Sequence, residues 1–210
     1  MYKVIVDFFQ DGGIFMYPIM VVLALGLSIA LERYLYLTVV KRKNKALLKK
    51  LIPMLQSGDF QGAYAVTSKS NHAISRMLSE GMICMKTTTD RDEIETAIED
   101  SMMETIPQIE KRTHYLSMFA NIATLLGLLG TIIGLIKAFS AVAAVDPALK
   151  GEILSTSISV AMNTTAFGLI TAIPLILIYT ILQAKTTEII VSLEMAVVKF
   201  LKLLSKRKEK

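Results

Sequence analysis

Three long runs of uncharged residues constrain this chain more than any other feature of its sequence. They occupy 12–31, 113–136 and 153–184, and each reaches the roughly 18 to 20 residues that a helix needs to cross a bilayer. Hydrophobic residues make up 53% of the chain, which is high for a soluble domain. No stretch alternates polar and apolar side chains for about 10 residues, as the strands of an outer-membrane barrel do. The sequence therefore predicts an all-α, multi-pass membrane protein with three transmembrane helices.

The first run has an alternative interpretation as a cleaved signal peptide, because the small residues at 28–30 resemble a cleavage site. The flank before the run contains two Asp and one Lys, whereas the flank of a secretory signal is positively charged. The apolar segment also continues to Val40 around the pair Glu32-Arg33. We therefore expect a retained membrane anchor, with Glu32 and Arg33 paired with each other near its cytoplasmic end.

Basic residues flank the three runs unevenly. They cluster in 41–50, at 111–112 and in 199–210, whereas the N-terminal flank and the link between the second and third runs have one Lys each. The positive-inside rule then predicts an N-out, C-in topology, and spans two and three are expected to extend into a cytoplasmic helical bundle. The expected order is a periplasmic N-terminal segment (1–13), transmembrane helix 1 (14–40), a cytoplasmic helical domain (41–113), transmembrane helix 2 (114–141), a periplasmic link (142–152), transmembrane helix 3 (153–184) and a cytoplasmic C-terminal helix with a basic tail (185–210).

The cytoplasmic segment 41–113 reads as a set of helices. Asp59 and Asn71 are placed to cap two of them, and the last is expected over 90–112. Pro107 should bend this last helix, which is expected to run directly into the second span. Acidic and basic residues are nearly balanced in this segment, which argues against nucleic-acid binding. The basic tail instead suits contact with the anionic lipids of the membrane surface.

The sequence offers little material for metal, redox or enzymatic chemistry. The single Cys84 cannot close an internal disulfide, and His72 and His114 are too few and too far apart for a metal site. No Ser/Lys, His/Glu or paired-Asp constellation lies at membrane depth. We therefore expect no metal, no cofactor and no enzymatic activity.

Small residues recur along the second and third runs at helical spacing. In lipid, such residues let helix backbones approach closely, and their hydroxyl groups can bond across helices. One interpretation is therefore a pair of helix-packing surfaces. The other is a partly polar lining of an ion pathway, because Asn163, Thr164 and Thr165 place several hydrogen-bonding groups in one turn. The small residues are Ala120, Thr124, Gly127, Thr131, Gly134, Ala138 and Ala141 in the second run, and Ser157, Ala161, Thr164, Gly168 and Thr171 in the third.

Depth along the helices singles out two threonines. At 1.5 Å per residue, Thr131 and Thr165 each lie roughly 4.5 Å from the midpoint of their span, toward the same side of the membrane. Lys137 lies roughly 13 Å from the midpoint, where its side chain can reach the outer headgroups as an anchor or entrance charge. Neither run contains Asp or Glu at hydrocarbon depth. If the chain conducts ions, another subunit must supply the titrating group.

Two segments carry a resemblance to a known family. The first is 127–134, with Gly127, Gly130, Thr131 and Gly134, and the second is 164–174, with Thr164, Thr165, Gly168 and Pro174. Together they closely resemble the signature segments of the MotA/TolQ/ExbB proton channel family. The resemblance covers nearly the whole chain and is greatest to the three-span ExbB/TolQ-like branch.

The resemblance implies a pore-forming subunit of a motor in the bacterial inner membrane. A homopentamer would surround a dimer of an ExbD/TolR-like single-span partner, whose membrane aspartate carries the proton. Thr131 and Thr165 would face the pore, with Thr164 and Asn163 beside the ion pathway. Proton flow would perform work on a TonB- or TolA-like load protein, energising TonB-dependent transport. The residues of the packing or pore face would be Gly127, Gly130, Gly134, Ala161, Gly168 and Pro174.

One departure from the family pattern keeps the transported ion open. ExbB-like members often have a glutamate where Val160 stands. Hydroxyl and amide oxygens such as those of Thr165 and Asn163 can also coordinate a sodium ion. The alternatives are therefore a sodium-driven motor, a Tol- or gliding-type motor of the same family, and a passive membrane scaffold ring.

Overall fold

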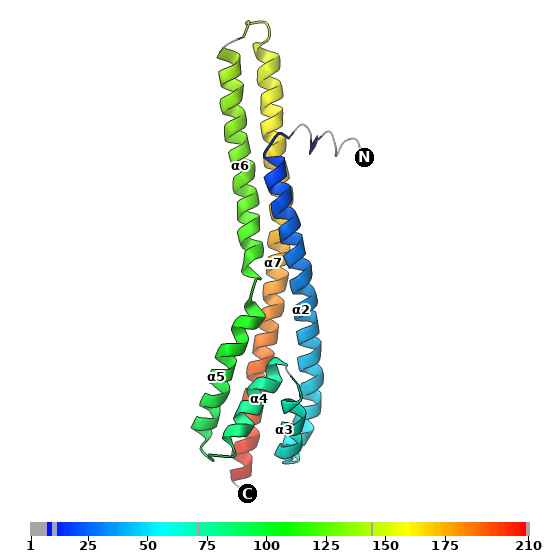
Figure 1. Cartoon of the computed structure of the whole chain (residues 1–210), viewed down its shortest axis with the longest axis vertical. Coiled ribbons are helices and arrows are strands. Elements are labelled where there is room, and N and C mark those ends of the chain that lie inside the picture. The colour runs from blue at the N-terminus through cyan, green and yellow to red at the C-terminus, as the bar shows by residue number, and fades with distance from the viewer. Residues whose placement is uncertain (1–7, 10–11, 71, 144, 209–210) are drawn as a thin grey trace. The chain divides into compact units, whose positions relative to one another are not determined.

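The computed structural model describes residues 8–9, 12–70, 72–143 and 145–208, and this part of the chain is helical throughout its regular structure (Figure 1). Three segments are long and apolar enough to cross a membrane, namely Met16–Gln56, Arg91–Ala143 and Lys150–Ser205. The all-α, three-span fold class is therefore confirmed, whereas the N-out, C-in orientation stays a prediction. The helices are α2 (Met16–Gln56), α3 (Phe60–Ser68), α4 (Ala73–Cys84), α5 (Arg91–Glu110), α6 (His114–Ala143) and α7 (Lys150–Lys208).

The chain divides into two compact units, which we name the span unit and the head unit. The span unit comprises Met1–Glu32 and Arg112–Ile181, and the head unit comprises Arg33–Lys111 and Leu182–Lys210. The helices α2 and α7 each contribute one part to both units. The three apolar runs thus belong mainly to the span unit, and the basic clusters that follow them belong mainly to the head unit.

The expected continuous helix from 90–112 into the second span is interrupted. Helix α5 passes through Pro107 and ends at Glu110, and α6 begins at His114 after a turn. Arg112 in this turn has a φ of 68°, a left-handed conformation that a right-handed helix cannot include. The break therefore lies at Arg112 and not at the proline.

Local capping explains where the short helices of the head unit begin. Asp59 accepts a hydrogen bond from the amide of Gly62 at 2.8 Å, as its sequence position predicts. Asp90, where the last of these helices is expected to start, accepts one from the amide of Asp92 at 3.2 Å. Helix α4 has His72 at its N-cap, without a side-chain capping bond. The predicted cap Asn71 lies outside the described residues.

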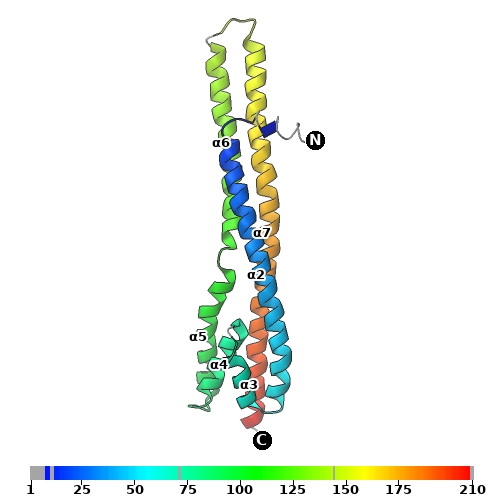
Figure 2. The same ribbon diagram turned by 45° about the vertical axis from the view of Figure 1, so that its right-hand side comes forward.

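The span unit depends on a close approach of α6 and α7, which run side by side in both views (Figure 2). A Cβ atom built on Gly168 would lie 2.7 Å from the carbonyl oxygen of Ala123 and 3.0 Å from the Cα of Gly127. Further along, a Cβ on Gly134 would lie 2.8 Å from the Cβ of Ala161. The small-residue faces of the two helices therefore pack against each other within one protomer.

Replacing Gly168 by Ala is expected to weaken this helix contact. The added methyl group would collide with backbone atoms of α6, which cannot move aside as a flexible side chain can. We expect a loss of about 1–3 kcal/mol, measured as a lower Tm of the purified chain in detergent.

Gly151→Ala is the matched control for Gly168→Ala. Gly151 also lies in α7, but no atom lies within 4 Å of a Cβ built at this position. Alanine favours a helix over glycine, so the control should keep or slightly raise the Tm. Equal melting temperatures for the two variants would show that the close approach is not needed for stability.

Candidate functional site

Two threonine hydroxyl groups meet where α6 and α7 approach each other. The side chains of Thr131 on α6 and Thr165 on α7 are hydrogen-bonded to each other. Both hydroxyl groups also lie near the carbonyl oxygen of Gly127, at 3.2 Å from Thr131 Oγ1 and 2.9 Å from Thr165 Oγ1. We name these two residues the threonine pair. The structure thus brings together the two hydroxyl groups that the sequence placed at one depth.

The threonine pair makes three oxygen–oxygen contacts but has only two hydroxyl protons to donate. Each hydroxyl group carries one proton and two lone pairs. If Thr131 donates to Thr165, then Thr165 can donate to Gly127, and the reverse order satisfies the same three oxygen atoms. The two arrangements differ only by rotation of the hydroxyl protons. In either one, lone pairs remain open to a protonated carboxyl group or to a cation.

The glycines are the reason that the threonine pair can form. A Cβ atom on Gly127 would lie 3.3 Å from the Cα of Thr165 and 3.3 Å from the Cα of Gly168. A methyl group at 127 would force α7 to shift by a few tenths of an ångström, which would lengthen the 2.9 Å contact between the Thr165 hydroxyl and the Gly127 carbonyl. The sequence left two interpretations of the small residues open, helix packing and an ion pathway. Both concern the same contact between α6 and α7 at the threonine pair.

Thr164 has a different environment from its neighbour Thr165. It is 2% exposed, and its hydroxyl lies 2.5 Å from the carbonyl oxygen of Gly12 and 3.0 Å from that of Val160. The turn at 12–15 covers it, with Gly13 at a φ of 73°. Thr164 therefore holds the N-terminal turn on α7 and does not face open space in the protomer. Nothing in the sequence pattern separated its role from that of Thr165.

Aromatic contacts hold the same N-terminal region against α7. The rings of Phe8 and Phe9 meet the ring of Phe167 edge-on, at centroid distances of 6.4 Å and 5.6 Å. This arrangement suits the quadrupoles of aromatic rings. The N-terminal region is thus an integral part of the site, which sequence reasoning treated only as a flank.

The other predicted site residues are placed as follows. Asn163 is half-buried, and within the described part of the chain its side chain has no hydrogen-bond partner. Gly130 lies against Thr164, since a Cβ there would meet the Thr164 methyl group. Lys137 and Pro174 are exposed in the protomer. The structure therefore groups Gly130 with the packed side of the site, and it leaves Lys137 and Pro174 on the surface.

The charged residue Glu32 has a partner far away in the sequence. Its two carboxylate oxygens each lie 3.1 Å from Nη1 of Arg112, the residue with positive φ. The sequence suggested a pair with neighbouring Arg33. Arg33 donates instead to the carbonyl oxygen of Ile109 in the head unit. The contact with Glu32 explains why the turn before α6 carries an arginine.

Thr164→Val should loosen the N-terminal turn. The substitution keeps the side-chain volume but leaves the Gly12 carbonyl without its donor, at a cost of about 1 kcal/mol. Faster hydrogen exchange of the amides in 12–16 would report this change. Thr156→Val is the control, because Thr156 is exposed and its hydroxyl bonds only within α7, to Glu152. Exchange that is equally fast in both variants would contradict the proposed clamp.

Comparison with known proteins gives a consistent result. A model of the MotA/TolQ/ExbB proton channel family matches residues 69–195. This range contains the threonine pair and the close approach of α6 and α7.

Curated proteins are similar to this chain over most of its length. A putative biopolymer transport protein ExbB homolog of Methanothermobacter thermautotrophicus is 26% identical over 193 residues, covering 91% of this chain and 67% of that protein. The biopolymer transport protein exbB1 of Vibrio cholerae is 28% identical, covering 79% of this chain and 73% of that protein. A putative ExbB-like biopolymer transport protein of Synechocystis is 23% identical, covering 79% of each chain.

Proposed function

Because this chain belongs to the MotA/TolQ/ExbB proton channel family, we propose that it is the pore-forming subunit of an ion-driven motor of the ExbB/TolQ type. The family consists of channel and motor subunits, not enzymes. The chain is a multi-pass membrane protein with three segments able to span a bilayer. We place it in the bacterial inner membrane with its N-terminus outside, because the basic clusters follow the first and third spans.

The titrating group of the motor comes from a second protein. Helix α6 contains no acidic residue, and α7 contains none between 153 and 184. A single-span ExbD/TolR-like partner, present as a dimer inside a homopentamer of this chain, supplies a carboxyl group at membrane depth. The exposed apolar residues of α6 and α7, among them Leu128, Ile132 and Ile173, provide surfaces for such an assembly.

The threonine pair is the observation that carries the proposal. A carboxyl group in a low-dielectric pore favours its protonated form, and a hydroxyl donor stabilises the ionised form. In either arrangement the pair can accept a hydrogen bond from a carboxyl group through its free lone pairs. If one hydroxyl proton rotates away from the Gly127 carbonyl, the pair can instead donate to a carboxylate, and neither step moves a helix. Each charge that crosses releases roughly 2.3 kcal/mol per 100 mV of membrane potential.

The work is performed on a protein outside the membrane. The names of the similar proteins refer to biopolymer transport, which supports a TonB-like load and TonB-dependent uptake. A TolA-like load would use the same membrane machinery. The contacts that choose between them belong to the partner, since the site in this chain concerns only the ion.

Thr131→Val and Thr165→Val should each reduce ion flux by roughly tenfold or more, because a hydrogen bond to a charged group is lost while the volume is kept. The assay uses liposomes that contain this chain and its single-span partner, with a pH-sensitive dye inside and an imposed membrane potential. Thr165→Ser keeps the hydroxyl and should retain most of the flux. A parallel assay with a sodium dye identifies the ion.

Thr180→Val is the matched control for these variants. Thr180 also lies in α7, but it is exposed and its hydroxyl bonds only to Ile176 in the same helix. Unchanged flux in Thr131→Val and Thr165→Val would favour a passive scaffold ring. Equal flux with and without the partner would contradict the division of labour between the two proteins.

A further inference from the structure

The head unit contains a cavity that the motor function does not use. It lies between α2, α4 and α5 and has a volume of about 370 Å³. This volume is larger than a few water molecules need. None of the residues that line it is acidic. Its lining consists of Tyr36, Val39, Val40, Lys43 and Asn44 from α2, His72, Ala73 and Arg76 at the start of α4, and Thr105, Gln108 and Ile109 from α5.

Asn44 is the first sign that the cavity has an occupant. The residue is 3% exposed, and within the described part of the chain neither Nδ2 nor Oδ1 has a hydrogen-bond partner. Buried amide groups are almost always hydrogen-bonded in folded proteins. A buried amide without a partner in the wall of a cavity indicates a polar ligand.

The N-terminus of α4 opens at the same place. This helix runs from Ala73 to Cys84, and its N-cap His72 makes no side-chain capping bond. The His72 side chain therefore does not occupy the amide groups of the first helical turn, and the helix dipole favours a negative charge beside them. The geometry thus selects an anion over a cation.

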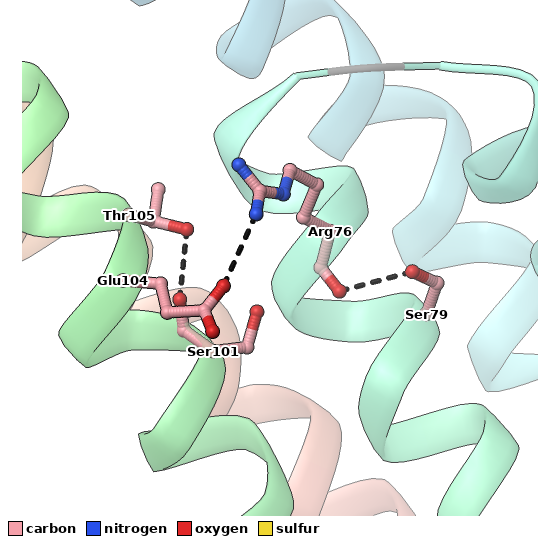
Figure 3. A network of polar contacts seen from close by, with 5 residues as sticks. All are labelled: Arg76, Ser79, Ser101, Glu104 and Thr105. Atoms are coloured by element: carbon pink, nitrogen blue, oxygen red, sulfur yellow. Dashed lines mark hydrogen bonds and ion pairs between the residues drawn. The ribbon is translucent and has the colours of Figure 1, made fainter.

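Two cationic side chains line the cavity. Arg76 reaches from α4 toward α5, where its Nη2 lies 3.2 Å from a carboxylate oxygen of Glu104, next to Thr105 (Figure 3). This is its single ion pair among the described residues, and both side chains are well exposed, so the contact neutralises Arg76 only in part. Lys43 on α2 adds a second positive charge.

A third cationic residue, Arg33, contacts residues of the cavity lining from outside it. Arg33 is 3% exposed, donates to the carbonyl oxygen of Ile109, and lies 4.7 Å from the centre of the Tyr36 ring. Both Ile109 and Tyr36 line the cavity. Arg33 therefore contacts two of the residues that line the cavity.

We infer that this cavity binds a phosphate group, carried either by a phospholipid or by a soluble compound. Guanidinium, ammonium and amide donors from three helices suit the several oxygens of a phosphate. The segment of α2 that lines the cavity is 36–44. In this segment the apolar sequence ends and the basic cluster 41–45 begins. Basic pockets at the cytoplasmic ends of transmembrane helices are suited to anionic lipid headgroups. The apolar side, formed by Val39 and Val40, suits an acyl chain.

The test measures binding to the full chain purified in detergent, with inorganic phosphate and short-chain phosphatidic acid as separate probes. Diacylglycerol with the same acyl chains is the uncharged probe. The expected result is saturable binding of phosphatidic acid, inorganic phosphate or both, with a raised Tm, and no effect of diacylglycerol. Binding of phosphatidic acid alone identifies the lipid as the source, and tighter binding of inorganic phosphate identifies a soluble compound.

The double variant K43Q/R76Q should weaken binding of the phosphate probes at least about tenfold. Asn44→Leu should also weaken this binding, without lowering the Tm of the chain measured without a probe. The control K45Q/R91Q removes the same net charge outside the cavity, and Arg91, like Arg76, pairs with an exposed glutamate. Equal binding by the two double variants, or no saturable binding of either phosphate probe to the wild type, would overturn the inference. Because no partner or ion flux is measured, the result is independent of the proposed motor function.

Discussion

The absence of side chains at Gly127 and Gly168 is the constraint on which the membrane part of this protein depends. With no Cβ atoms between them, the backbones of α6 and α7 come close enough for Thr165 to reach the Gly127 carbonyl. The same approach brings Thr165 to Thr131. The glycines therefore do more than pack two helices. They also bring two hydroxyl groups into contact within the apolar runs of the two helices.

Charged residues make contacts between helices in the head unit, outside the uncharged contact of α6 and α7. Where the apolar part of α2 gives way to the basic cluster, Lys41 pairs with Glu188 of α7 at 2.5 Å, and Lys185 lies 3.8 Å from the centre of the Tyr34 ring. Both contacts lie within the head unit. Cations at the start of the head unit thus have partners on a neighbouring helix, and these contacts join α2 to α7.

The sequence predicted those features that follow from periodicity and length. Uncharged runs predicted the three spans, and a fixed rise per residue placed Thr131 and Thr165 at one depth. Features that depend on a single conformation or on distant residues were missed. Arginine carries no signal for the positive φ of Arg112, and its partner Glu32 lies 80 residues away in the sequence. The cover over Thr164 and the cavity beside Asn44 likewise arise from segments that meet only in the fold.

The choice of ion can be argued from the surroundings of Val160. The resemblance to the family leads one to expect a glutamate at this position, and a Cβ on Gly13 would lie 3.2 Å from the methyl group of Val160. Its carbonyl oxygen accepts a bond from Thr164. The N-terminal turn therefore packs on an apolar side chain at this position, and a carboxylate there would lie partly covered by the turn instead of fully in solvent. With no acid at this position, the site of this chain offers hydroxyl and amide groups, which do not titrate themselves. In the motor that we propose, selectivity between a proton and a sodium ion therefore rests on the carboxyl group of the partner, and this subunit determines how that group is held.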